Sequence, residues 1–286
     1  MTVSRPLFLP AASLDEALEA KEENSAASFI AGGTSLIADR DAREPAGYIS
    51  LRRIPALQEI ERRTDGLFVG GGCTIATLLR DPRVARASLL VQAGRATATR
   101  QVRSRATIGG NIAVARADRS LPPCLLALDA SVHVHSREGL RLVPFERYLN
   151  DRVKAAETTD PEILVGVTVP HTGGHHHYSR IAAGNGGGYA TVSVALLFDR
   201  ERHVVRIGLG GVGPTARRAH EAEAFAEAAV DWKGGSAPPS LATRIGEIAA
   251  QHCDPPTDVS ASSAYRRHAV VVMVRRALEE AWEATR

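Results

Sequence analysis

Residues 103–123 read RSRATIGGNIAVARADRSLPP, and the fold depends most on the run Thr107–Asn111 at their centre. Two adjacent glycines, Gly109 and Gly110, remove two Cβ atoms directly behind a hydroxyl residue. Backbone N–H groups can therefore close around an anionic oxygen while the Thr107 hydroxyl also donates. This composition predicts a loop that binds a pyrophosphate, with Thr107, Gly109, Gly110 and Asn111 as its candidate residues.

A second run of the same kind, AGGTS, follows the apolar pair Phe29-Ile30. Either run alone is also typical of an ordinary turn or helix entry. Two such runs in one chain, each entered from an apolar segment, favour two loops that bind one dinucleotide from opposite sides. The candidate residues of the earlier loop are Ala31, Gly32, Gly33, Thr34 and Ser35.

The length of 286 residues is sufficient for about two domains with substantial cores. Phe, Trp and Tyr make up only 5% of the sequence, so aliphatic residues must supply those cores. The 35 basic residues nearly balance the 32 acidic ones, and the excess is spread along the chain. Because no basic block is present, nucleic acid is not expected as a partner.

Cysteine usage and the N-terminal sequence bear on the compartment. Cys73, Cys124 and Cys253 lie far apart, without the CxxC spacing of a zinc site or an iron–sulfur cluster. Each is expected to be a reduced, buried thiol. The N-terminal residues lack the apolar core of a signal peptide, and no run approaches the roughly 20 apolar residues that cross a bilayer. We therefore expect a soluble, cytoplasmic protein with no membrane segment.

Three units follow from the order of the expected elements: 1–56, 57–172 and 173–286. The first has a strand, a helix begun by the capping box at Ser13–Glu16, the glycine loop at Ala31–Ser35 and another strand. The second has two hairpins, a third glycine loop at 70–74 and several helices. The third has strands over Tyr189–Phe198 and Val204–Leu209 before three helices, the last expected over 262–286.

The run Gly173-Gly174-His175-His176-His177 is open to two interpretations, a metal site or a loop. Adjacent side chains on an extended chain alternate in direction, so three consecutive histidines do not converge on one ion unaided. No Glu or Cys lies nearby in the sequence. The loop interpretation is therefore favoured, and no metal site is expected.

With these patterns read, the chain resembles the FAD-binding, or medium, subunit of the molybdenum hydroxylases, a group that includes xanthine dehydrogenase and carbon monoxide dehydrogenase. The matching runs occur in family order over nearly the whole chain. They are AGGTSLI (31–37), RRIPAL (52–57), VGGGCTI (69–75), VRSRATIGGNIA (102–113), LPPCLLALDASV (121–132), EILVGVTVP (162–170), GGVGPTARRA (210–219), SSAYRRH (262–268) and VRRAL (274–278).

The resemblance implies an α+β protein: a two-part FAD-binding region of the vanillyl-alcohol-oxidase-like (PCMH-type) fold, followed by an α+β C-terminal domain that closes on the flavin. By position, the two glycine loops would hold the FAD pyrophosphate, and Leu164 would lie against the ring system. Arg180 stands where the family commonly has a lysine near the isoalloxazine. Tyr189 stands at the position of an aromatic residue that covers one flavin face in some members. A cation there stabilises the reduced flavin, and an aromatic ring shields it.

The sequence departs from the family pattern around the implied flavin. Ser104 and Ala106 replace an asparagine and a glycine of the common VRNRGTIGG run. Ser120 replaces the aspartate that contacts the cofactor before the LPP run. The segment Asn185–Gly188 replaces an arginine–x–glycine–aspartate run and is one residue longer.

Three functions remain open on the sequence. The first is a flavin-dependent electron-transfer subunit that works with iron–sulfur and molybdopterin partner subunits and passes electrons to NAD⁺ or another acceptor. The second is a free-standing FAD oxidoreductase acting on a small molecule, with Arg180, Tyr189 and His175 as candidates for substrate contact. The third is a non-catalytic scaffold that has lost the flavin. No catalytic base is assigned, because none of the ten histidines has a sequence neighbour that fixes its role.

Overall fold

The N-terminal unit is a small parallel sheet covered by one helix. In this computed structural model, which describes residues 7–38, 45–154, 160–182, 188–233 and 238–284, the sheet has the order β1-β3-β2. Its elements are β1 (Leu7–Pro10), α1 (Leu14–Glu23), β2 (Ala27–Ile30) and β3 (Gly47–Ser50). The capping box predicted for α1 is confirmed, since Glu16 N–H donates to Ser13 Oγ and Ala12 N–H donates to Glu16 Oε2.

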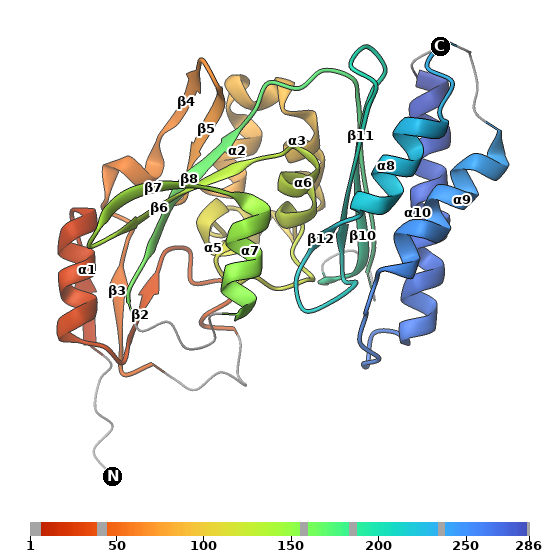
Figure 1. Cartoon of the computed structure of the whole chain (residues 1–286). Helices are drawn as coiled ribbons and strands as arrows, with labels where there is room; N and C mark the ends of the chain where they lie inside the picture. Colours follow the sequence, from red (N-terminus) through yellow and green to blue (C-terminus); the bar gives the residue numbers. More distant parts are fainter. Residues whose placement is uncertain (1–6, 39–44, 155–159, 183–187, 234–237, 285–286) are drawn as a thin grey trace.

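The second unit is built on an antiparallel sheet with the order β4-β5-β8-β6-β7. Its strands are β4 (Ile60–Arg63), β5 (Gly66–Gly70), β6 (Ser131–Ser136), β7 (Gly139–Pro144) and β8 (Ile163–Val169). Its α-helices are α2 (Ile75–Arg80), α3 (Ser88–Ala96), α4 (Arg100–Arg103), α5 (Ile108–Ile112), α6 (Leu121–Ala127) and α7 (Phe145–Lys154), with short 3-10 helices at Pro55–Gln58 and Pro82–Arg86. Helix α1 lies beside the β6–β7 hairpin (Figure 1). An ion pair between Glu22 of α1 and Arg137 in the hairpin turn joins the two.

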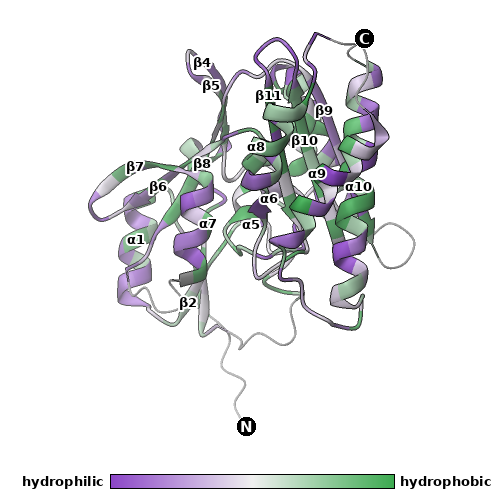
Figure 2. Cartoon of the chain, turned by 45° about the vertical axis from the view of Figure 1, so that its right-hand side comes forward, coloured by the Kyte–Doolittle hydropathy of each residue, from purple (hydrophilic) through white to green (hydrophobic). Residues whose placement is uncertain are grey.

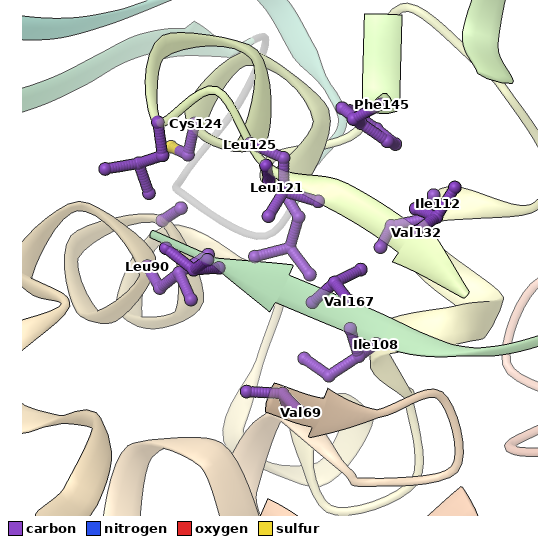
Figure 3. Close-up of a cluster of buried hydrophobic side chains, with 14 of the residues drawn as sticks. Val69, Leu90, Ile108, Ile112, Leu121, Cys124, Leu125, Val132, Phe145 and Val167 are labelled. Carbon is purple, nitrogen blue, oxygen red and sulfur yellow. The ribbon is translucent and has the colours of Figure 1, made fainter. Parts of the chain in front are cut away.

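Figure 3 shows how helix α5, which contains most of the run Thr107–Asn111, packs in the core of the second unit. Ile108 and Ile112 of α5 point into the same fully buried cluster as Val69 of β5, Val132 of β6 and Val167 of β8. Burial of each such aliphatic side chain is worth about 1.5–3 kcal/mol, so the apolar residues of α5 fix the helix on the sheet. The polar residues of the same run are thereby held at one edge of the core.

The C-terminal unit is a four-stranded antiparallel sheet with the order β12-β11-β10-β9. Its elements are β9 (His175–Ala182), β10 (Ala190–Asp199), β11 (Val204–Gly210), β12 (Arg217–Arg218), α8 (His220–Ala229), α9 (Pro239–Gln251) and α10 (Ser263–Ala284). Helices α8 and α10 pack on the outer face of this sheet and α9 packs on these two helices, whereas α3 and α6 of the second unit pack on its inner face (Figure 1). Strand β10 is buried along its whole length because both faces are covered.

Hydropathy follows this layering. In Figure 2 the strands β10 and β11 are largely hydrophobic, whereas α1, α7 and α10 carry hydrophilic residues on their outward sides. No helix among the described residues is long and apolar enough to cross a membrane. The three sheets fall within 1–56, 57–172 and 173–286, although the boundaries themselves stay predictions.

Some elements differ from the sequence expectation. The prediction that His175–His177 form a loop is wrong, because these residues begin β9 and pair with Leu196–Phe198 of β10. Only the preceding residues 170–174 connect β8 to β9. Pairing with an apolar neighbouring strand overrides the weak strand propensity of a histidine run. Helix α7 and strand β8 were not assigned from the sequence.

Candidate cofactor-binding cavity

The two glycine loops meet in the structure. Gly32 lies so close to the preceding segment of the second loop that a Cβ atom would overlap the carbonyl oxygen of Arg105. Gly33 has a φ of +74°, a left-handed conformation that favours glycine. The close approach and the positive φ together explain why this position requires two consecutive glycines.

The first loop presents free donors. Its turn is closed by hydrogen bonds to the carbonyl oxygens of Gly33 and Ser35, from Ile37 and Ala38. The backbone N–H groups of Gly33, Thr34 and Ser35 donate to no acceptor within the described residues. Three successive donors at one turn form a binding surface for an anionic oxygen.

The second loop is arranged differently, because the N–H groups of the first turn of α5 are already used. Thr107 caps the helix and accepts from Gly110 N–H at 3.0 Å. Gly109 N–H donates to the Gly71 carbonyl at 2.7 Å, and a Cβ at Gly109 would lie 2.8 Å from that oxygen. Gly109 therefore allows α5 to pack against the third glycine loop, and its part in holding a pyrophosphate stays a prediction.

A cavity of about 400 Å³ lies between the two loops and the C-terminal unit. Eleven of the thirteen predicted site residues line it: Ala31, Gly32, Gly33, Thr34, Ser35, Thr107, Gly110, Asn111, Ser120, Arg180 and Tyr189. Gly109 is not among the lining residues, and neither is Leu164, which lies on β8 with its carbonyl oxygen facing Gly71. The contact of Leu164 with a flavin stays a prediction. Asn111 also positions α6, because its Oδ1 accepts from Leu121 N–H.

Sequence reasoning missed the charged group on one wall. Arg119 is only 8% exposed, yet its Nε has no hydrogen-bond partner among the described residues. Its guanidinium carbon lies 4.7 Å from the centre of the Tyr189 ring, and that of Arg116 lies 5.1 Å from it. Asp118 binds Arg116 at 2.7 Å and is more distant from Arg119, at 3.6 Å. The sequence signal was the charged run RADR (116–119), four residues after the second glycine loop.

The structure shows the surroundings of Ser120 and Gly188, two of the positions at which the sequence departs from the family pattern. Ser120 is buried just before α6, and its carbonyl oxygen accepts from the Cys124 thiol. Tyr178 is nearby, and burial raises the pKa of its phenol well above the ordinary value. Arg180 donates to the Gly188 carbonyl at 3.0 Å, whereas Asn185, Gly186 and Gly187 lie outside the described residues.

These residues fit FAD. The three free N–H groups and the hydroxyls of Thr34 and Ser35 provide donors for a pyrophosphate, and Arg119 adds a buried cation. Tyr189, which is 52% exposed, supplies an aromatic face at the open end of the cavity. The cavity is thus donor-rich at the glycine loops and aromatic at the C-terminal unit, as a dinucleotide with a flavin ring requires.

The three cysteines do not take part in this site. All are free and buried, which confirms the expectation of packed thiols. Cys73 Sγ lies 3.5 Å from the Glu59 carbonyl, and burial raises the pKa of this thiol to about 11. His175, a candidate for substrate contact, also lies away from the cavity, beside α10.

The fold and the family match together define a protein of the FAD-binding flavoprotein class. The chain belongs to the family of the FAD binding domain in molybdopterin dehydrogenase, whose model matches residues 4–172, followed by a CO dehydrogenase flavoprotein C-terminal domain over 177–281. The protein is therefore a FAD-dependent oxidoreductase component, as its resemblance predicted.

Relatives of known function support this assignment over the full chain. The sequence is 30% identical to the nicotine 6-hydroxylase medium subunit of Paenarthrobacter nicotinovorans, with 96% of each chain covered. It is 29% identical to the carbon monoxide dehydrogenase medium chain of Hydrogenophaga pseudoflava, with 90% of each covered. Among solved structures, quinoline 2-oxidoreductase from Pseudomonas putida 86 matches with a TM-score of 0.86 at 27% identity, covering 99% of both chains. The α+β fold prediction is confirmed by this match.

Proposed function

We propose that this chain is the electron-transferring FAD subunit of a molybdenum hydroxylase complex, accepting electrons from an iron–sulfur partner and passing them to NAD⁺ or another acceptor. The observation that carries the proposal is the cavity between the two glycine loops, with its three free N–H groups and the buried Arg119. Medium subunits of nicotine 6-hydroxylase and carbon monoxide dehydrogenase align with the whole chain.

In this proposal different residues bind different parts of the cofactor. Gly33, Thr34 and Ser35 bind the pyrophosphate through their N–H groups, and Arg119 neutralises its charge. Arg180 and Tyr189 line the part of the cavity formed by the C-terminal unit, where a fixed cation and an aromatic face favour the reduced flavin. The bound FAD would supply the chemistry, because a flavin takes up electrons singly or in pairs and so links one-electron clusters to a two-electron acceptor.

Partner subunits follow from the same proposal. The chain has no cysteine motif for an iron–sulfur cluster, and its three cysteines are buried and far apart. In this proposal the clusters and the molybdopterin lie outside these 286 residues, on partner subunits. A free-standing FAD oxidoreductase is the alternative, but its proposed substrate contact His175 does not line the cavity. The scaffold without flavin is disfavoured by the intact donor set.

The test compares electron transfer with and without a partner. The chain is purified alone with FAD, and also after co-expression with a molybdopterin subunit and a two-cluster ferredoxin-like subunit of a molybdenum hydroxylase from the same organism. Stopped-flow absorbance under anaerobic conditions follows the flavin after addition of the dithionite-reduced ferredoxin-like subunit, and separately after NADH. Rapid flavin reduction by the cluster subunit supports the proposal. Stable flavin binding with partner-independent turnover of a small molecule, and no electron uptake from the cluster subunit, would refute it.

The rate at which NADH reduces the flavin tests whether NAD⁺ is the electron acceptor. Flavin reduction by NADH faster than about 1 s⁻¹, the lower end of ordinary enzyme turnover, would indicate NAD⁺ as the physiological acceptor. Slow reduction by NADH with rapid reoxidation by O₂ or a quinone would assign a different acceptor and leave the subunit role intact.

A further inference from the structure

The histidine run that begins β9 presents its side chains to two different elements. His175 and His177 alternate with His176, so they lie on one face of the strand. That face is turned to α10, where Glu280 approaches both of them. His176 points the other way, to Ser88 of α3.

The distances bring three ligand atoms together. His177 Nδ1 lies 3.0 Å from Glu280 Oε2, and His175 Nε2 lies 3.6 Å from Glu280 Oε1. One ligand atom from each of the three residues falls within a mutual separation of 4.8 Å. In a tetrahedral zinc site with bonds of about 2.0–2.1 Å, ligand atoms are about 3.4 Å apart. The two distances to Glu280 bracket this value, and all three ligand atoms lie close enough to converge on one ion after side-chain adjustment.

An unsatisfied nitrogen points to a ligand at this place. His175 Nε2 is buried and has no hydrogen-bond partner among the described residues. A buried polar atom without a partner destabilises the fold, and a metal bond would remove that penalty. The two imidazoles are mostly covered, whereas the Glu280 side chain is 56% exposed, so one side of the cluster is open to water. Three protein ligands and an open fourth position suit a zinc-type ion.

We propose that His175, His177 and Glu280 form a site for a divalent transition-metal ion of the zinc type, with water as the fourth ligand. Two neutral imidazoles and one carboxylate favour Zn²⁺, Co²⁺, Ni²⁺ or Cu²⁺ over Mg²⁺ and Ca²⁺, which prefer oxygen ligands. The sequence argued against a metal because no Glu or Cys stood near the histidines, but the fold supplies Glu280 from a distant helix.

The ion would join two elements that are far apart in the sequence. Strand β9 is the edge of the C-terminal sheet, and α10 is the last helix packed on that sheet. A metal bond between them ties the edge strand to the outer helix, and binding to the folded state alone raises the stability of this domain. This site is separate from the flavin cavity, so the inference does not depend on the proposed function.

The test measures metal binding and its effect on stability. The full chain, freed of any affinity tag and treated with a chelator, is dialysed against ZnCl₂, and bound zinc is counted by elemental analysis. The expected result is one retained equivalent and a rise in the midpoint of thermal unfolding. Co²⁺ in place of Zn²⁺ should give the intense visible absorption of a four-coordinate ion, whereas MgCl₂ should change neither quantity.

Matched variants locate the site. His175→Asn, His177→Asn and Glu280→Gln should each weaken zinc binding by more than about tenfold and abolish the thermal shift. His252→Asn is the control, because it removes a histidine of the same unit that faces a single carboxylate, Glu221. Each variant is compared with its own zinc-free form, so a loss of basal stability does not obscure the result. Zinc binding that survives in the double variant H175N/H177N, or no binding by the wild-type chain, would overturn the proposal.

Discussion

The Cα atom of Gly32 faces the carbonyl oxygen of Arg105, with no room between them for a Cβ atom. The substitution Gly32→Ala must therefore push the two glycine loops apart. Overpacking of this kind costs about 1–3 kcal/mol, and the displacement also spoils the donor geometry of the first loop. We expect at least a tenfold weaker affinity for FAD, about 1.4 kcal/mol, measured by the quenching of flavin fluorescence.

Gly213→Ala is the control for this substitution, since a Cβ there would meet its nearest neighbour at 3.8 Å, an ordinary contact. It should leave FAD affinity unchanged. Equal affinities of the two variants would show that the approach of the loops does not govern binding.

Arg119 is expected to act mainly through its charge. Hydrogen bonds to charged groups contribute about 1.5–3 kcal/mol, so Arg119→Gln should weaken FAD binding about tenfold or more. Binding by the variant should also depend less on salt concentration. Isothermal titration at two ionic strengths measures both effects. Arg83→Gln, which breaks an ion pair with Asp81 outside the cavity, should alter neither, and an unchanged salt dependence in Arg119→Gln would count against a phosphate contact.

Arg266 ties α10 to the C-terminal sheet. Its buried guanidinium donates to the carbonyl oxygens of Thr191 and Gly211 and to both oxygens of Asp258, at 2.8 Å each. Arg266→Met leaves two buried carbonyls unpaired, at about 1–3 kcal/mol apiece. Urea unfolding should show this loss, whereas Arg244→Met, an exposed pair with Glu247, should cost well under 1 kcal/mol. Similar losses in both variants would argue against the carbonyl contacts.

Asp258 makes this junction sensitive to acid. Backbone hydrogen bonds and Arg266 hold the pKa of its carboxyl below the ordinary value. The stability that the ionised Asp258 contributes is therefore fully present above the ordinary pKa of about 3.9. It is lost as the pH falls through the lower pKa of the folded state. The stability difference between the wild type and Asp258→Asn should shrink as the pH falls below about 4, as measured by urea unfolding. A difference that stays constant down to pH 2 would exclude this linkage.

His176 should make stability depend on pH near neutrality. Burial lowers the pKa of His176 below the ordinary value of about 6.5. Below pH 6.5 the unfolded chain therefore binds a proton at this residue that the folded chain does not bind. Stability should fall as the pH drops from about 6.5, and His176→Gln should flatten this fall. His133, whose pKa burial also lowers, contributes in the same direction, so His133→Gln is the comparison. An identical pH profile in wild type and His176→Gln would contradict the assignment.

Most of the predicted site residues lie around one cavity because the determinants of their positions are local. Glycine runs report close backbone approaches at their own positions, and the family motifs place Ser120, Arg180 and Tyr189 by number alone. Eleven of the predicted residues therefore line one cavity. Gly109 does not line it and packs against Gly71, because a glycine required for packing has the same sequence signature as one that contacts a phosphate.

The remaining features depend on contacts between distant segments, which local patterns do not show. The buried Nε of Arg119, which has no hydrogen-bond partner among the described residues, is apparent only when the residues around it are known. The histidine run became a strand because β10 offers it a partner, and Glu280 approaches it from the last helix. A single sequence gives no sign of either partner.

All three units contribute to the walls of the cavity: Gly33 comes from the first, Thr107 from the second and Tyr189 from the third. No unit expressed by itself would then possess a complete binding surface. The flavin is in this sense a probe of assembly, since its spectrum and fluorescence will report whether the three parts of the chain have docked. Refolding followed by flavin signal would time the last docking event of the chain, which a probe of secondary structure cannot distinguish from the folding of each part.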